Sequence, residues 1–432
     1  MPHKPASRHS LRRVTALLAA GAVALPLTLA ACGGDEGEDG TIELEILWWG
    51  GPERAQATEA ALDLYEERHP NVTIHRRWQG YDGYYDGLST NAAAGDAPDI
   101  FQIDENLLSE FATNGITYDL SEFLGDTIEV DALAPGLLET GTVDGQVAGL
   151  VAAQNTPGLI YDRTVVQQYG LPEPEIGMSW EELIDWAEQI SQASDGQVYG
   201  TSDPSHDYKA LWVWLRQRGQ ELYEDGELGF SEADLTEWFQ LWAEARASGA
   251  APPPDVSNPA IGGDVSSQLV ITQQAATSFM WDNQLSELSE GTDHELGLTA
   301  YPGDPSGQWA RPSMFWSIYA GSEHAEAAAD VINFLINDPE AGQLLGAERG
   351  LPPNLDVREQ VADSFSEAMQ EVVAFEEQMV DQFGDAPSPP PPGHAEVRRL
   401  LEDAAQNVQF GRATPAEAAA SFFEQAASAI SL

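Results

Sequence analysis

The alternation of short apolar strands with amphipathic helices constrains the fold of this 432-residue chain more than any other feature. Residues 42–49 alternate apolar and polar side chains at their start, which is typical of a β-strand. Residues 53–69 then place apolar side chains on one helical face before a stop at Pro70. Residues 72–74 and 99–103 are expected to be two further short strands. Strands separated by helices predict α/β units with largely parallel sheets.

Later helices carry clear start signals. Ser179 with Glu182 forms a capping box before an apolar helical face, and Thr414 with Glu417 repeats the pattern with a proline at the first helical position. Asp338, followed by proline, is expected to end one helix and start another.

The N-terminus is the only basic part of the chain. Four cations lie in residues 1–13 without an acid, and residues 14–31 carry no charge, which is typical of an export signal. A membrane anchor is the alternative for 14–31, but a proline and a small-residue ending argue against it. Leu29-Ala30-Ala31-Cys32-Gly33 resembles the lipobox of bacterial lipoproteins, in which the signal is cut before the cysteine and that cysteine is lipidated. The single cysteine, Cys32, stands at that position, and a buried or incidental thiol is the alternative.

The segment after Cys32 is small and acidic, so residues 32–40 are expected to form a flexible tether. We therefore expect residues 1–31 to be a lipoprotein signal peptide and the body from Thr41 on to lie at the extracytoplasmic face of the membrane, held there by lipid. General and twin-arginine export both remain open.

The net charge is −52, from 71 Asp and Glu against 19 Lys and Arg. Such a polyanion is repelled by phosphate backbones, so nucleic acid is excluded as a partner. From Cys32 on, Lys209 is the single lysine, beside 14 arginines. Because self-repulsion on this scale is relieved when molar salt shortens the Debye length to about 3 Å, the acidity predicts a halophilic source. Codon bias is the alternative explanation for the scarcity of lysine.

Motifs of catalysis and of cofactor binding are missing from the sequence. It contains no nucleophile elbow, no metalloprotease motif, no phosphate-binding glycine loop and no dinucleotide fingerprint. One cysteine and eight scattered histidines offer no metal site of familiar spacing. We therefore expect no cofactor, no metal and no enzymatic activity. Carboxylate pairs for glycoside hydrolysis are too easily found among so many acids to be informative.

Aromatic residues gather where strands end. Trp48 and Trp49 close the first strand, and Trp281 follows the apolar run 276–280. Ligands of open α/β domains bind at the carboxyl ends of strands, and an indole ring beside polar groups suits a sugar. The alternative is that each tryptophan only fills the core. That alternative is favoured for four tryptophans within helical patterns, namely Trp180, Trp186, Trp238 and Trp242.

The order of these segments resembles the extracellular solute-binding protein family 1, the carbohydrate-binding lipoproteins of ABC importers. The stretches that carry the resemblance cover nearly the whole chain after the tether; they are LEILWWG at 44–50, YEERHPNV at 65–72, AAGDAPDIF at 93–101, TPGLIYD at 156–162, YGLP at 169–172 before SWEEL at 179–183, AATSFM at 275–280, EAAA at 326–329 through NFL at 333–335, and GLPP at 350–353.

The resemblance implies an α/β, two-lobed periplasmic-binding-protein-like fold, with a hinge and a ligand cleft between the lobes. Lobe one would comprise residues 41–153 plus 296–346, and lobe two residues 154–295 plus 347–432. The chain would capture a sugar or oligosaccharide by hinge closure, deliver it to a membrane permease, and act as a monomer.

The resemblance also implies a set of ligand-binding residues. In lobe one these are Trp48 or Trp49, Gln102 and Asp104; in lobe two they are Asn155, Trp281 and Asp282. Where many relatives have a glycine pair, this chain has Arg311-Pro312-Ser313. Arg311 either binds a sugar carboxylate or points to solvent. A lipid-anchored glycoside hydrolase and a surface polysaccharide-binding protein remain the alternative functions.

Overall fold

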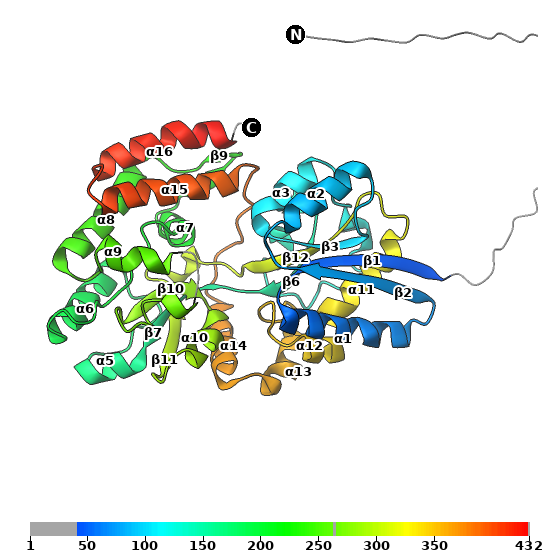
Figure 1. The fold of residues 1–432 in the computed structure, drawn as a ribbon, viewed down its shortest axis with the longest axis horizontal. Helices are drawn as coiled ribbons and strands as arrows, with labels where there is room; N and C mark the ends of the chain where they lie inside the picture. Colours follow the sequence, from blue (N-terminus) through cyan, green and yellow to red (C-terminus); the bar gives the residue numbers. More distant parts are fainter. Residues whose placement is uncertain (1–40, 262–264, 431–432) are drawn as a thin grey trace, which may run out of the picture. The chain divides into compact units, whose positions relative to one another are not determined.

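The computed structural model describes residues 41–261 and 265–430, so the expected signal peptide, Cys32 and tether lie outside the described residues. The described chain forms two main β-sheets, each covered by helices (Figure 1). Two short hairpins accompany them, β4 (Thr142–Val143) with β5 (Gln146–Val147) and β8 (Tyr223–Glu224) with β9 (Glu227–Leu228).

The first sheet has five strands, in the order β2 (Val72–Gln79), β1 (Ile42–Trp49), β3 (Ile100–Ile103), β12 (Pro312–Ile318) and β6 (Leu150–Gln154). β1 pairs in parallel with β2 and β3, whereas β12 is antiparallel to both β3 and β6. The three strands expected near the N-terminus are thus confirmed. β2 runs beyond the expected residues 72–74, and the apolar pattern did not mark its later residues because they are polar and mostly exposed.

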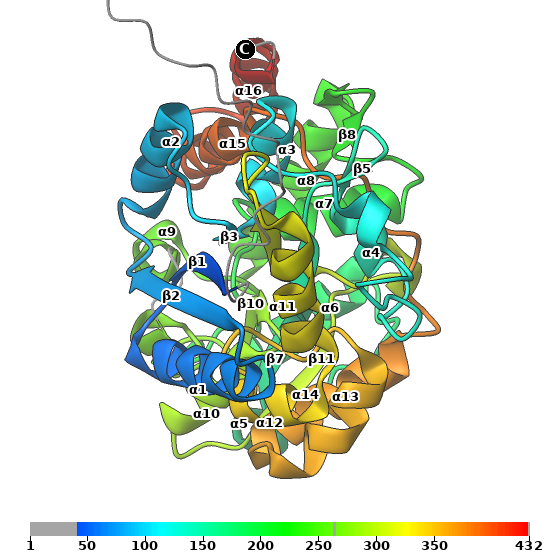
Figure 2. The same ribbon diagram turned by 90° about the vertical axis from the view of Figure 1, so that its right-hand side faces the viewer.

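Consecutive side chains of β1 point to opposite faces of this sheet. Trp48 enters the core that it shares with residues of α1 (Pro52–Arg68) and α11 (Ala325–Asn337), and Figure 2 shows α1 below β2. Trp49 enters the core on the other face, beneath α2 (Tyr84–Ala94), α3 (Glu105–Thr113) and α4 (Leu137–Thr140). The two neighbouring tryptophans therefore lie in different environments.

The second sheet corrects two expectations. Its three strands, in the order β10 (Thr277–Trp281), β7 (Pro157–Asp162) and β11 (Leu296–Ala300), are all antiparallel, so the sheets are not largely parallel overall. β11 was expected in lobe one, but it forms its hydrogen-bonded ladder with β7 along its whole length, which places it in the second sheet. The other lobe boundaries stay a prediction.

Helices fill the space around the second sheet. An aromatic-rich core lies on one side, and it contains all four of the tryptophans assigned to helical core positions. The helices here are α5 (Arg163–Tyr169), α6 (Trp180–Ala193), α7 (Tyr208–Arg216), α8 (Glu232–Ser248), α9 (Pro254–Ser257), α10 (Gln284–Glu290), α14 (Glu367–Met379), α15 (His394–Gln409) and α16 (Pro415–Ile430). α12 (Pro339–Leu345) and α13 (Leu355–Val361) follow α11. As expected, Asp338 ends α11 and caps α12.

The chain crosses between the two sheets at neighbouring places. It leaves the first sheet between β6 and β7, where the Asn155 amide donates to the Arg311 carbonyl over 3.0 Å. Residues 301–311 return to the first sheet, and Gln154 and Leu351 exchange two backbone hydrogen bonds of 2.8 and 3.0 Å beside them. Two of the expected ligand-binding residues, Asn155 and Arg311, lie at these crossings.

Candidate functional site

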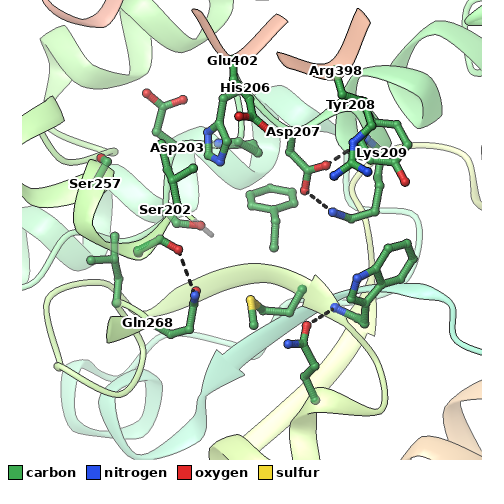
Figure 3. A pocket seen from close by; sticks show the side chains of 18 residues that line it. Ser202, Asp203, His206, Asp207, Tyr208, Lys209, Ser257, Gln268, Arg398 and Glu402 are labelled. Carbon is green, nitrogen blue, oxygen red and sulfur yellow. Dashed lines mark hydrogen bonds and ion pairs between the residues drawn. The ribbon is translucent and has the colours of Figure 1, made fainter. Parts of the chain in front are cut away.

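A cavity of about 310 Å³ opens on the side of the second sheet, where β10 ends. Its wall is made by the loop 202–207 and the start of α7, by the end of β10, by two side chains of α15, and by Ser257, Ala260, Ile261, Gln268 and Leu269. Figure 3 shows Lys209, Tyr208 and Arg398 on one side, and Ser202, Ser257 and Gln268 on the other. We call this the Trp281 cavity, after the large aromatic side chain at its mouth.

Trp281 is the last residue of β10 and is partly exposed. Its backbone amide donates to Gln284 Oε1 over 3.2 Å, which fixes the turn from β10 into α10. Two cations face its ring, since Arg311 Cζ lies 4.2 Å and Lys209 Nζ 4.7 Å from the ring centroid. Cations over an indole ring are held by its electron-rich face.

Lys209 is positioned by the start of α7. Asp207 caps that helix by accepting from the Lys209 amide over 2.9 Å, and it pairs with the Lys209 ammonium at 2.8 Å. Burial lowers the pKa of Lys209, and the Asp207 carboxylate opposes that shift. The Lys209 ammonium in turn helps to lower the pKa of Asp207, outweighing the burial of that carboxyl.

Arg398 reaches the cavity from α15. Its Cζ lies 4.6 Å from the Tyr208 ring centroid, and its Nη1 donates to Asn106 Oδ1, at the start of α3, over 3.0 Å. Its buried Nε has no hydrogen-bond partner in the described part of the chain. Among the ion pairs of residues 41–261 and 265–430, none includes Arg398.

Arg311 is buried and has protein partners. It forms an ion pair with Glu105, and its Nη2 donates to Tyr208 Oη over 2.8 Å. The carboxylate of Glu105 outweighs burial and raises the pKa of Arg311. Arg311 therefore joins α3, which covers the first sheet, to α7, which covers the second. Of the two expectations for Arg311, the one in which it points to solvent is wrong.

The expected residues of lobe one contact other protein groups. Trp48 and Gln102 are 0% exposed, and Gln102 Oε1 accepts from Arg349 Nε over 3.0 Å. Trp49 packs edge-on against Tyr81 and Tyr84 and at a tilt against Tyr85. Asp104 caps α3, and its Oδ2 accepts from the Tyr81 hydroxyl over 2.6 Å. None of these four expected residues lines the Trp281 cavity.

In lobe two, only one of the three expected residues lines the cavity. Trp281 does so, whereas Asp282 is 0% exposed and turned into the protein beside Glu376. Asn155 lies at the crossing between the sheets, and its buried Oδ1 has no partner within the described chain. A ligand role for these residues stays a prediction.

Sequence reasoning missed the cations and polar groups that line the cavity. Lys209 could have been found, since it is the single lysine after Cys32 and follows an acidic capping residue. Arg398 carries no local signal, because it is one of two adjacent arginines on a helix. His206 also lines the cavity, and its buried Nδ1 lacks a partner among the described residues.

Two further features bear on the chemistry. No group of three or more His, Cys, Asp and Glu side chains in the described ranges is arranged to hold a metal ion. Across the same ranges, the helices are too short or too polar to cross a bilayer.

Comparison with known proteins adds a family. A family model described as bacterial extracellular solute-binding protein matches residues 60–376. The chain is 30% identical over 183 residues to an uncharacterized lipoprotein of Streptomyces antibioticus, a match that covers 41% of this chain and 39% of that one. It is 23% identical over 199 residues to an uncharacterized ABC transporter extracellular-binding protein of Pyrococcus horikoshii, covering 43% and 46%. The chain thus spans less than half the length of these two curated relatives.

Two solved structures resemble the fold over most of the chain. An extracellular solute-binding protein family 1 structure from Alicyclobacillus acidocaldarius is 27% identical with a TM-score of 0.76, covering 91% of this chain and 99% of that one. A periplasmic oligogalacturonide binding protein from Yersinia enterocolitica is 22% identical with a TM-score of 0.77, covering 90% and 100%. These likenesses confirm the two-lobed, periplasmic-binding-protein-like fold expected from the sequence.

Proposed function

The chain belongs to the bacterial extracellular solute-binding proteins, and from that premise we propose that it captures a sugar or oligosaccharide outside the cytoplasm for an ABC importer. The observation that carries the proposal is the Trp281 cavity. Its volume of about 310 Å³ is in the range of small-molecule sites, which is about 300–1,000 Å³. The indole ring of Trp281 lines the cavity, as do the hydroxyl and amide groups of Ser202, Ser257 and Gln268, which Figure 3 shows on the side away from Lys209. This combination suits a sugar ring and its hydroxyls.

Contacts between α3 and the second sheet support capture by closure. Two contacts join the lobes beside the cavity: Arg311, which is paired with Glu105, donates to Tyr208 of α7, and Arg398 of α15 donates to Asn106 of α3. A ligand that strengthens such contacts stabilises the closed form over the open form, and that difference is what a permease can read. In this proposal, the Trp281 cavity is the second-lobe half of the site, and Trp49 and Asp104 supply the first-lobe half.

The relatives support a transport role and an extracytoplasmic place. The Pyrococcus horikoshii relative is named as an ABC transporter extracellular-binding protein, and the Streptomyces antibioticus relative as a lipoprotein. We extend to this chain a permease partner, a lipid anchor at Cys32 and a monomeric, non-catalytic mode of action. The oligogalacturonide-binding neighbour supports a carbohydrate as the class of ligand.

A thermal-shift screen with neutral and acidic oligosaccharides tests the proposal. We expect one sugar to raise the melting temperature and to reduce the radius of gyration in solution scattering. Trp281→Ala should weaken that sugar about tenfold or more, which corresponds to about 1.4 kcal/mol. Trp78→Ala is the matched control, because Trp78 is 41% exposed on β2 and does not line the cavity.

Two results would refute the proposal. Equal affinity of the Trp281→Ala and Trp78→Ala variants for the sugar would show that the sugar does not bind in the Trp281 cavity. Cleavage of the bound oligosaccharide by the purified protein would favour the glycoside hydrolase instead.

A further inference from the structure

Positive charge is scarce in this protein, and three of its cations lie close together. From Cys32 on, the chain has 71 acidic residues and, besides Lys209, 14 arginines. Lys209 lies within 6 Å of the ring centroids of both Tyr208 and Trp281, Arg311 within 6 Å of that of Trp281, and Arg398 within 6 Å of that of Tyr208. Gathering like charges in a partly buried wall is unfavourable unless negative groups compensate them.

Compensation inside the protein is incomplete. Glu105 neutralises Arg311, and Asp207 neutralises Lys209. Arg398 donates to the neutral side chain of Asn106 and lies over the Tyr208 ring, and the carboxylate near it, Glu105, is already paired with Arg311. The buried Nε of Arg398 is unpartnered within residues 41–261 and 265–430.

Among the described residues, no neighbouring titratable group forms an ion pair with Arg398. His394 packs on Tyr208, and burial, with Arg398 and Arg311 contributing, lowers its pKa well below the usual value, so it adds no charge at neutral pH. Glu402 lines the cavity one turn of α15 after Arg398, and no ion pair joins these two described side chains. Asp203, on the other side of the cavity, forms an ion pair with Arg246.

This arrangement suits a ligand with one negative group. A carboxylate, phosphate or sulfate against Trp281 would accept hydrogen bonds from the guanidinium of Arg398 and from the ammonium of Lys209. The rest of the sugar would extend toward Ser202, Ser257 and Gln268 (Figure 3).

We propose that the ligand of the Trp281 cavity is an anionic sugar, whose negative group is bound by Arg398 with Lys209. This inference rests on the proposed function, because it names the class of solute for the same site. It also differs from the expectation that Arg311 would bind a sugar carboxylate, since Arg311 is paired with Glu105.

Isothermal titration tests the inference with five probes at one ionic strength: digalacturonate, galactose 6-phosphate, galactose 6-sulfate, neutral digalactose and the non-sugar anion citrate. We expect at least one of the three anionic sugars to bind at least tenfold more tightly than digalactose. The three anionic sugars distinguish carboxylate, phosphate and sulfate as the recognised group.

Variants of adjacent arginines supply the matched comparison. Arg398→Gln should lower the affinity for the anionic sugar at least tenfold, and Arg398→Lys should restore part of it. Arg399→Gln should have no effect, because Arg399 is exposed and paired with Glu396 and Asp403. The melting temperature of each unliganded variant shows whether it is folded, and Arg398→Lys carries the test if Arg398→Gln does not fold.

The possible outcomes separate the two proposals. Tighter binding of digalactose, or an equal loss by Arg398→Gln and Arg399→Gln, overturns the anionic ligand and leaves the sugar-binding function standing. Binding of citrate alone, lost in Arg398→Gln, keeps the anionic site and overturns the sugar. Binding of none of the five probes counts against both.

Discussion

Two carboxyl side chains are buried side by side where β10 meets α14. Asp282 is 0% exposed and Glu376 2%, and Gln154 donates from its amide to Glu376. Asp282 Oδ2 and Glu376 Oε1 have no hydrogen-bond partner in the described chain. Burial raises the pKa of Asp282 well above its usual value, and the neighbouring Glu376 raises it further. One proton shared between the two orphan oxygens would satisfy both.

The residue-scale prediction follows from this shared proton. Because the pKa of Asp282 is raised on folding, its contribution to stability is fully present below the unfolded pKa of about 3.9 and is lost as pH rises through the folded pKa. Asp282→Asn keeps a donor for Glu376 without the titrating group, so we expect the variant to be more stable than the parent at pH 7. The advantage should shrink toward pH 4, as measured by urea unfolding across that range.

Asp304→Asn is the control for that prediction. Hydrogen bonds from the Ser306 amide and hydroxyl lower the pKa of the exposed Asp304 carboxyl, so its contribution is present above pH 4 and is lost as pH falls. The two variants should therefore change the slope of stability against pH in opposite directions. The same slope in both would contradict a shared proton at Asp282.

At the scale of the element, two glycines show how differently helices are constrained. Gly200 passes so close to α6 that a Cβ would lie 2.1 Å from the Cα and the carbonyl oxygen of Ala187. Gly87 lies within α2, with ordinary backbone geometry and nothing within 4 Å of an added Cβ. Close packing thus requires glycine in one case and not in the other.

Substitution of each glycine by alanine should change stability with opposite signs. Gly200→Ala forces α6 away from its neighbour and should cost about 1–3 kcal/mol. Gly87→Ala removes backbone entropy from the unfolded chain at an exposed helical position and should gain about 0.5–1 kcal/mol. Denaturant unfolding of both variants checks this, and destabilisation by Gly87→Ala would show that α2 is held by something other than its own propensity.

At the scale of the whole molecule, excess negative charge opposes the compact state. Ion pairs compensate only a minority of the 71 acids, because Lys and Arg total 19. Self-repulsion between distant surface charges is screened once the Debye length falls from about 10 Å at 0.1 M to about 3 Å at 1 M salt. A halophilic source is our proposal from this charge.

Salt should accordingly raise the melting temperature. We expect it to increase steadily between about 0.05 and 2 M NaCl in the unliganded protein. The NaBr curve should coincide with it, because screening depends on ionic strength and not on the anion. A flat NaCl curve would contradict the halophilic source, and separate NaCl and NaBr curves would attribute the effect to ion-specific hydration.

Much of the fold was determined by signals within a few residues of one another. The strand at 42–49 and the capping of α6 by Ser179 and Glu182 are present as expected. Thr414 and Glu417 likewise exchange their hydrogen bonds at the start of α16. Local propensity and capping operate inside one turn or one strand, so they can be found in the sequence without knowledge of the rest of the chain. The order of the segments then identified the family.

The tertiary structure alone decided which side chains line the Trp281 cavity. Trp281 was found because it ends a strand, but Lys209 and Arg398 come to it from α7 and α15, far apart in the chain. Trp48 and Trp49 were expected as interchangeable candidates, and the pleat of β1 sends them into different cores. Spacing along the sequence cannot encode such meetings, because they depend on how separate elements pack and on which strand pairs with which. The sequence thus determined the class of the fold and the negative charge of the protein. Packing determined that Lys209, Arg311 and Arg398 lie close together.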